Sequence, residues 1–337
     1  MNSFFPGTSA AGGAGTAAGS DHGHGGRTLA EVGEFALIDE ITADLPAGPD
    51  VVIGPGDDGA VLAVDSPLVC SVDVLIQDVH FKSQWSSAED VGRKAVAVNV
   101  ADIEAMGGTA TAIVVGFAAP PDTPESWALD FARGLRTECD TAGVSLVGGD
   151  VTRSAQIAIS VTVLGTLDGR APVRRDGARP GQVVALRGRV GWAAAGLAVL
   201  GRGFRSPRVA VQAQQVPEVP YGQGKAAALA GATSMIDISD GLLADLGHVA
   251  VQSSVAIDLR RDSFEIADPL QAVAAATGSD PLKLILTGGE DHALAATFAA
   301  AAVPEGWTVI GEVSEGEPAV TVDGATWEGG SGWDHYA

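Results

Sequence analysis

The sequence is poor in positive charge and has no long apolar run. Of its 337 residues, 20 are Lys or Arg against 42 Asp or Glu, which gives a net charge of −22. Such a surface repels nucleic acids and anionic membranes, so neither is expected as a partner. No run of about 18 apolar residues is present, which excludes a membrane-spanning helix. The same charge would repel ATP unless divalent cations are recruited.

Cysteine is also scarce. Two cysteines, Cys70 and Cys139, cannot build a disulfide framework or a four-cysteine zinc site. Their apolar neighbours predict buried thiols in a reducing compartment. The N-terminus has no basic segment followed by an apolar one, so a secretory signal is not expected and a cytoplasmic location is predicted.

The few lysines exclude the common kinase motifs. The chain has four, and "GQGKAAA" around Lys225 lacks both the glycine spacing and the Ser or Thr that follows lysine in a P-loop. The protein-kinase combination of a lysine, a catalytic loop and DFG is missing too. Any phosphate chemistry must therefore use different groups.

The chain divides into a leader and two halves. Residues 1–32 are rich in Gly and Ala and have no apolar period, which predicts a disordered leader. From Gly33 on, helix and strand patterns alternate, and the Gly-, Pro- and Arg-rich stretch 168–182 indicates a boundary. We therefore expect two α/β domains, at 33–167 and 168–337. Helices are predicted within 86–108 and 123–143, and a strand is predicted within 66–76.

Aspartates beside glycine or small polar residues are abundant. Glycine lets a backbone approach a phosphate closely, and carboxylates are the hard oxygen ligands that Mg²⁺ prefers. Carboxylates from many separate loops predict several Mg²⁺ ions holding one polyphosphate. The series is Asp57, Asp58, Asp73, Asp102, Asp150, Asp237, Asp240 and Asp291.

Simpler explanations exist for several of these residues. "VGGD" can be a strand-ending turn, and "DISDGL" can be a helix start capped by Ser239 or Asp240. Asn99 and His80 can be satisfied polar residues of a core. Asp237 stands between two isoleucines in a strand-like run, where a carboxylate costs free energy unless it has a partner or a metal. A non-catalytic Ca²⁺-binding protein remains an alternative, although no 12-residue EF-hand loop is present.

Eight motifs in order carry a resemblance to a known family. They are "GEFALI", "GPGDDGAVL", "SVDVLIQDVHF", "RKAVAVNVADIEAMGG", "LVGGDVTR", "RRDGARPGQ", "IDISDGLLADLGHV" and "LTGGEDHAL", with "GWDHY" as a last match. Together they resemble the thiamine-monophosphate kinase family, whose superfamily includes aminoimidazole ribonucleotide synthetase and selenophosphate synthetase. Another ATP-dependent enzyme of that superfamily is the alternative. The reactive Cys or Sec that a selenophosphate synthetase typically carries near its N-terminus is missing from residues 1–32.

The resemblance implies a fold and an activity. The fold is the α/β aminoimidazole ribonucleotide synthetase-like fold, with the ATP- and Mg²⁺-binding N-terminal domains pairing in a homodimer through a shared β-barrel. The activity is direct in-line transfer of the γ-phosphoryl group of ATP to thiamine monophosphate, giving thiamine diphosphate.

The resemblance also implies roles for individual residues. The implied metal ligands are Asp58, Ser71, Asp73, Asp102, Asp150, Asp237 and Asp240. Four of them, Asp58, Asp73, Asp150 and Asp240, are expected to be catalytic. Contacts to ATP are expected from Gly149, Asp150, Arg175 and Ser239, with Arg174 as the alternative to its neighbour. Contacts to thiamine monophosphate are expected from His80, Glu290 and Trp333. Trp333 can stack on a cationic ring or pack the C-terminus onto the core.

Overall fold

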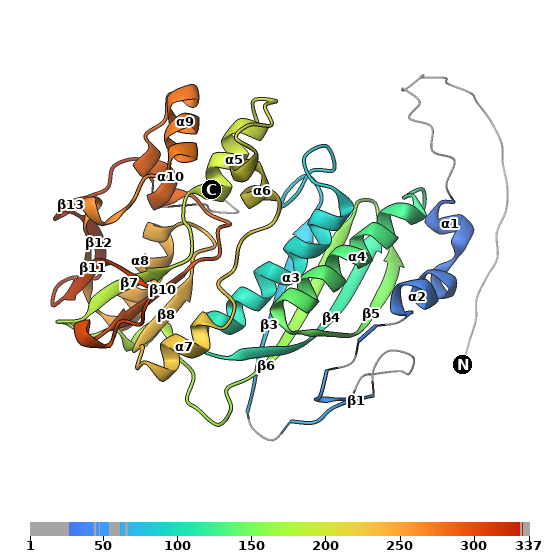
Figure 1. Cartoon of the computed structure of the whole chain (residues 1–337), viewed down its shortest axis with the longest axis horizontal. Helices are drawn as coiled ribbons and strands as arrows, with labels where there is room; N and C mark the ends of the chain where they lie inside the picture. Colours follow the sequence, from blue (N-terminus) through green and yellow to red (C-terminus); the bar gives the residue numbers. More distant parts are fainter. Residues whose placement is uncertain are drawn as a thin grey trace, which may run out of the picture.

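The chain forms two β-sheets, one from each half of the sequence (Figure 1). The computed structural model describes residues 27–330 and 332, apart from 44, 47, 54–60, 65 and 66. The first sheet has the strand order β3-β6-β4-β5. Its strands are β3 (Leu68–Ile76), β4 (Thr109–Ala119), β5 (Ser145–Arg153) and β6 (Ala158–Thr166). Two short strands, β1 (Val51–Ile53) and β2 (Val61–Leu62), pair separately.

The second sheet has seven strands in the order β13-β12-β9-β11-β7-β10-β8. They are β7 (Val183–Arg187), β8 (Ser234–Asp237), β9 (Ala256–Leu259), β10 (Leu294–Phe298), β11 (Thr308–Ser314), β12 (Ala319–Val322) and β13 (Ala325–Thr326). Edge strand β8 is buried along its whole length and ends at Asp237. The Asp237 carboxylate therefore lies at the edge of the second sheet that packs on α3 (Ala88–Ala105) of the first half.

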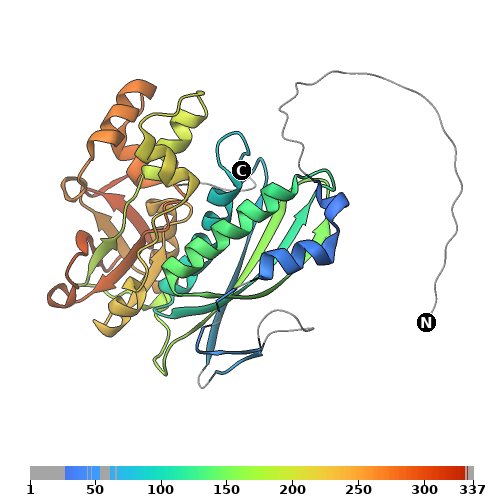
Figure 2. The same ribbon diagram turned by 45° about the vertical axis from the view of Figure 1, so that its right-hand side comes forward.

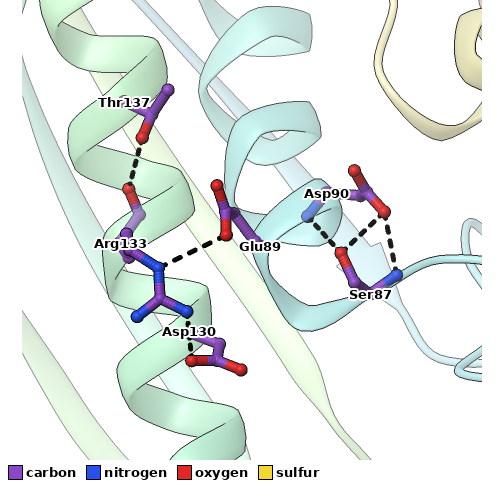
Figure 3. A network of polar contacts seen from close by, with 6 residues as sticks. All are labelled: Ser87, Glu89, Asp90, Asp130, Arg133 and Thr137. Carbon is purple, nitrogen blue, oxygen red and sulfur yellow. Dashed lines mark hydrogen bonds and ion pairs between the residues drawn. The ribbon is translucent and has the colours of Figure 1, made fainter.

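Two long helices lie side by side on one face of the first sheet (Figures 1 and 2). They are α3 (Ala88–Ala105) and α4 (Glu125–Ala142). Helix α3 begins with a reciprocal cap: the Ser87 hydroxyl accepts from the Asp90 amide at 3.1 Å, and the Asp90 carboxylate accepts from the Ser87 amide at 3.0 Å (Figure 3). This arrangement satisfies two amides that a helix start leaves unpaired.

Glycines bring α3 and α4 unusually close. A Cβ atom on Gly134 would lie 2.0 Å from the carbonyl oxygen of Glu89, and one on Gly92 would lie 2.2 Å from that of Phe131. At the edge of this contact the Arg133 guanidinium bonds Glu89 at 3.3 Å and also pairs with Asp130 (Figure 3). Because a side chain at either glycine would meet backbone, the contact fixes the position of α3 on the sheet.

Helix α3 also contacts the second half of the chain. Helix α7 (Gln223–Leu229) approaches so closely that a Cβ on Gly224 would lie 1.9 Å from the Glu104 carbonyl oxygen. The buried Glu104 carboxylate accepts from the amides of Gly222 and Gly224, both at 2.7 Å. Since α3 packs on β8 as well, this helix joins the two halves.

The remaining helices lie at the N-terminus and around the second sheet. Helix α8 packs on that sheet, while α5, α6, α9 and α10 pack on one another. Their bounds are α1 (Leu29–Val32), α2 (Glu34–Thr42), α5 (Trp192–Leu200), α6 (Arg208–Gln215), α8 (Leu242–Ser253), α9 (Asp268–Thr277) and α10 (Pro281–Thr287). Short 3₁₀ helices cover Arg175–Gly177, Arg261–Ser263 and Ala300–Ala302.

The predicted long helices and the strand within 66–76 are confirmed, and three details are corrected. Strand β5 continues through "GGD" to Arg153, because these residues pair with β4, so the segment is no turn. Regular structure includes α1 at Leu29–Val32, within the stretch assigned to the leader; residues 1–26 lie outside the described part. Cys70 is exposed, whereas Cys139 is buried, as predicted. Across the described residues, no helix is long and apolar enough to cross a membrane.

Candidate active site

Strand β3 and helix α3 bring the first predicted residues together. The Ser71 hydroxyl donates to the Asp102 carboxylate at 2.6 Å. The Asn99 side-chain oxygen accepts from the Asp73 amide at 2.9 Å, and its nitrogen donates to the Ala95 carbonyl at 2.9 Å. Asn99 is therefore a satisfied polar residue that holds the strand against the helix. Ser71 and Asp73 on the strand therefore face Asp102 on the helix.

The end of β8 adds a third carboxylate, Asp237, and the loop before β10 adds a histidine, His292. The side chains of Asp237 and His292 are both buried, with Nδ1 of the ring 3.0 Å from a carboxylate oxygen. Burial lowers the pKa of His292, but the hydrogen bond to Asp237 and its charge outweigh this and raise the pKa overall. The His292 amide donates to the Ile238 carbonyl at 2.8 Å, which fixes the two loops beside each other.

The carboxylates of this cluster oppose each other's ionisation. Burial and the charge of Asp237 raise the pKa of Asp102 to about 7. Burial is also the main cause that raises the pKa of Asp73, with Asp237 adding to it. Acids that repel one another in a low dielectric are stabilised by a cation.

The carboxylates do not form a closed metal cage. Among the described residues, no three or more His, Cys, Asp or Glu side chains are already arranged around one metal position. This fits Mg²⁺ better than a tightly caged ion, because Mg²⁺ usually takes one or two carboxylates and completes its shell with water and phosphate oxygens. The donor set of Asp73, Asp102 and Asp237 is therefore compatible with metals that arrive with a nucleotide.

The loop before α8 presents Ser239 and Asp240. The alternative explanation, in which one of them caps the helix, does not hold: α8 begins after Gly241 and has no side-chain cap. Instead, the buried Asp245 carboxylate accepts from the amides of Asp240, at 3.1 Å, and Gly241, at 3.0 Å. Burial raises the pKa of Asp245 to about 7. The side chains of Ser239 and Asp240 thus remain available to a ligand.

A cavity of about 480 Å³ adjoins this cluster through Asp73 and His292, whereas Ser71, Asp102 and Asp237 are not among its lining residues. Six predicted or neighbouring residues line it, namely Asp73, His80, Ser239, Asp240, Glu290 and His292. A larger cavity of about 820 Å³, bordered by Arg93, Arg189, Arg205 and Arg208, contains none of the predicted site residues. Chemistry rather than size therefore identifies the smaller cavity as the candidate active site.

A buried lysine, Lys94, lines the cavity, and the sequence analysis assigns it no role. The Lys94 ammonium is 3.1 Å from both carboxylate oxygens of Glu290 and donates to the carbonyls of His80, at 3.1 Å, and Gln214, at 3.4 Å. Glu290 adopts a left-handed backbone with φ of 66°, held by its amide donating to the Ser239 carbonyl at 2.7 Å. A lysine amid the apolar residues of a helix was the available sequence signal.

Asp291, one of the aspartates in the predicted series, has a structural role. Its carboxylate accepts from the amides of Gly191, at 2.5 Å, and Ala193, at 2.8 Å, at the start of α5. Burial raises the pKa of Asp291 to about 7 despite these bonds. It therefore holds α5 against the loop that carries Glu290 and His292.

Other predicted residues lie apart from the cavity. Asp150 and Gly149 are on β5, the opposite edge of the first sheet from β3, about 14 Å away at the usual strand spacing. Gly149 is needed by the sheet, since a Cβ there would lie 2.3 Å from the Val115 carbonyl oxygen. The Arg174 guanidinium pairs with Asp176 at 2.5 Å. Asp57, Asp58 and Trp333 lie outside the described residues.

Relatives of known name share this sequence and fold. The family model described as AIR synthase related protein, N-terminal domain, matches residues 56–167. A thiamine-monophosphate kinase of Mycobacterium tuberculosis is 48% identical over 311 residues, covering 92% of this chain and 93% of the relative. The chain belongs to the thiamine-monophosphate kinase family. A Corynebacterium glutamicum member is 39% identical over 323 residues, covering 92% of this chain and 96% of its own length.

A solved structure of the family agrees with the fold. The structure described as AaThiL complexed with AMPPCP and TMP has a TM-score of 0.73 and 31% identity, covering 93% of this chain and all of that one. The α/β architecture with two sheets is thus that of the thiamine-monophosphate kinase family. Membership selects this family over the selenophosphate and aminoimidazole ribonucleotide synthetases, and over a non-catalytic Ca²⁺-binding protein.

Proposed function

We propose that the chain transfers the γ-phosphoryl group of ATP to the phosphate of thiamine monophosphate, forming thiamine diphosphate and ADP. The observation that carries the proposal is the convergence of the family's motifs on one cavity lined by carboxylates. The structure described with AMPPCP and TMP shows that a 31%-identical relative is found in complex with both. Phosphoryl transfer depends mostly on positioning and charge neutralisation, which this cavity supplies.

Several Mg²⁺ ions are proposed as part of the site. Asp73, Asp102 and Asp237 support this, because their mutual repulsion is relieved by cations. Ser71, Asp240, Asp58 and Asp150 complete the proposed ligand set. When bound, Mg²⁺ neutralises the phosphates and the charge that develops on the transferred group.

The residues of the chain have positioning roles in this reaction. The acceptor phosphate is already anionic at neutral pH, so direct transfer needs no strong general base and no phosphoenzyme. Ser239, Asp240, His80 and Glu290 all line the cavity, with the Glu290 amide donating to the Ser239 carbonyl. We assign Ser239, Arg175, Gly149 and Asp150 to ATP. We assign Glu290, whose carboxylate suits a thiazolium cation, to thiamine monophosphate, together with His80 and Trp333.

A homodimer is proposed, paired through the first sheet in a shared β-barrel. Apolar side chains stand exposed on strands β3 and β4: Leu68 at 46%, Val72 at 56%, Val74 at 45% and Val114 at 37%. An uncovered apolar sheet face of this kind is typical of a protein interface. Val72→Asp should convert a dimer to a monomer in analytical ultracentrifugation, and a monomeric parent chain would contradict the proposal.

Two further assignments accompany the function. The segments 33–167 and 168–337 are proposed as the two domains, because each contributes its own sheet and a hydrophobic core of its own. A cytoplasmic location is proposed on the two free cysteines, Cys70 and Cys139, which suit a reducing compartment.

The function is tested with the purified chain, ATP and MgCl₂. ADP release is measured with thiamine monophosphate or unphosphorylated thiamine as acceptor, and thiamine diphosphate is identified by chromatography. Turnover is expected only with the monophosphate and only with the divalent ion present. Equal turnover with thiamine would contradict the proposal. Rapid quench with γ-labelled ATP tests direct transfer, since label on the protein before product appears would show a phosphoenzyme.

A further inference from the structure

A buried glutamine on α6 stands out because the family motifs do not include it. Gln214 lines the candidate active-site cavity and is only 4% exposed. Its side-chain oxygen is buried and has no hydrogen-bond partner among the described residues. Buried polar atoms in folded proteins nearly always have a partner, so this amide points to a ligand.

The position of Gln214 is tightly fixed. Its carbonyl accepts from Lys94, and the next side chain, Gln215, donates to the carbonyl of Trp85. Helix α5 leaves room for it only because residue 196 is glycine: a Cβ there would lie 2.7 Å from the Cβ of Gln214. Residues in both halves of the chain therefore place this amide at the cavity.

The surroundings of the amide suit a flat, positively charged heterocycle. Trp85 and Phe81 line the same cavity and offer aromatic surface. The Glu290 carboxylate, held by Lys94, lines this cavity as well and offers a negative charge. A neutral amide is a weak partner for phosphate, but it matches a ring edge that carries an amino donor next to a nitrogen acceptor. Glutamine reads that edge in adenine through two parallel hydrogen bonds.

We propose that Gln214 determines substrate specificity by pairing with the aminopyrimidine ring of thiamine monophosphate. The exocyclic amino group donates to the Gln214 side-chain oxygen, and the adjacent ring nitrogen accepts from its side-chain nitrogen. A 180° flip of the Gln214 side-chain amide exchanges its oxygen and nitrogen, so either atom can face the ring. The inference rests on the proposed function and adds to it the group that recognises the pyrimidine.

The test is a double-mutant-type cycle that combines one substitution in the enzyme with one chemical change in the substrate. The Gln214→Leu variant and the parent chain are assayed with thiamine monophosphate and with its analogue lacking the amino group. In the parent, loss of the amino group should raise KM for the acceptor about tenfold, the usual effect of a good paired contact. In the variant, KM for thiamine monophosphate should rise by a similar factor, and loss of the amino group should then have almost no further effect.

Controls separate recognition from folding. Gln212→Leu changes an exposed glutamine on the same helix and should leave both KM values near those of the parent. KM for ATP should stay within about twofold in every variant, because the amide does not contact the nucleotide. If the Tm of Gln214→Leu is well below that of the parent chain, the cycle uses Gln214→Met instead, because methionine nearly keeps the side-chain length.

Two results would overturn the inference. The first is independence of the two changes: in the variant, loss of the amino group would raise KM by the same factor as it does in the parent chain. The other is an equal rise in the KM values for ATP and for thiamine monophosphate in the variant. Failure of the proposed function looks different, because the parent chain itself would then not phosphorylate thiamine monophosphate.

Discussion

Replacing Gly134 by alanine should force helices α3 and α4 apart. The new Cβ would lie 2.0 Å from the Glu89 carbonyl oxygen and 2.8 Å from its carbon, whereas ordinary contact begins at 3.4 Å. Both atoms belong to the backbone, so no side-chain rotation relieves the overlap and the helices must separate by about 1.4 Å. Overpacking of this kind costs about 3 kcal/mol, and the higher helix propensity of alanine returns about 1 kcal/mol.

The net loss of about 2 kcal/mol corresponds to a fall in Tm of roughly 4–8 °C, measured by calorimetry. Because α3 carries Lys94 and Asp102, kcat should also fall at temperatures where the variant is fully folded. The matched control is Gly247→Ala in α8, where a Cβ has nothing within 4 Å and stability should rise by up to about 1 kcal/mol. If Gly134→Ala is as stable as Gly247→Ala, the contact between α3 and α4 can accommodate a methyl group and the reasoning is wrong.

Three further outcomes are expected. Lys94→Met leaves Glu290 without its partner, so KM for thiamine monophosphate should rise several-fold in steady-state assays, and an equal rise for ATP would contradict this. Arg175→Ala should raise KM for ATP more than Arg174→Ala, because Asp176 holds Arg174; the reverse order would reassign the contact. In EDTA, the raised pKa of Asp102 means that the folded state binds more protons than the unfolded state between about pH 4 and 7. Its contribution to stability should therefore decline by up to about 1.4 kcal/mol per pH unit as pH rises to 7. Asp102→Asn should flatten that slope in urea unfolding, and an unchanged slope would refute the shifted pKa.

Local patterns in the sequence predict the elements that carry the site. Serines before an acidic first turn predict a cap of α3 at Ser86 or Ser87, and the structure has it at Ser87, paired with Asp90. Alternation along residues 68–76 predicts β3, whose partly buried Ser71 and Asp73 are on the same side of the strand. Such features depend on neighbours a few residues apart, which a single sequence displays.

Long-range contacts account for what the sequence did not predict. "GGD" looks like a turn, yet pairing with β4 extends it as a strand, and no local pattern states that pairing. Asp245 and Asp291 bond backbone amides, but a single sequence does not show which amides a given carboxylate will meet. Gln214 lies 120 residues from Lys94, and only the packing of α6 beside α3 places both at one cavity.

The charge inside the cavity explains how an acidic chain can handle two anionic substrates. Lys82 and Lys94 are the lysines that line it; Lys94 is paired with Glu290, and Lys82 lies 4.6 Å from the centre of the Trp85 ring. Lys94 is therefore already engaged by a carboxylate, and Asp73 and Asp240 add two more acidic side chains to the lining of the cavity. The proposed function therefore calls for cations bound with the nucleotide, and on that proposal turnover should follow the concentration of the Mg²⁺ complex of ATP rather than that of ATP. On the proposed mechanism the protein contributes what the metals would not: a fixed α3 that holds Glu290 through Lys94, and a cavity that would hold the acceptor in line with the transferred group.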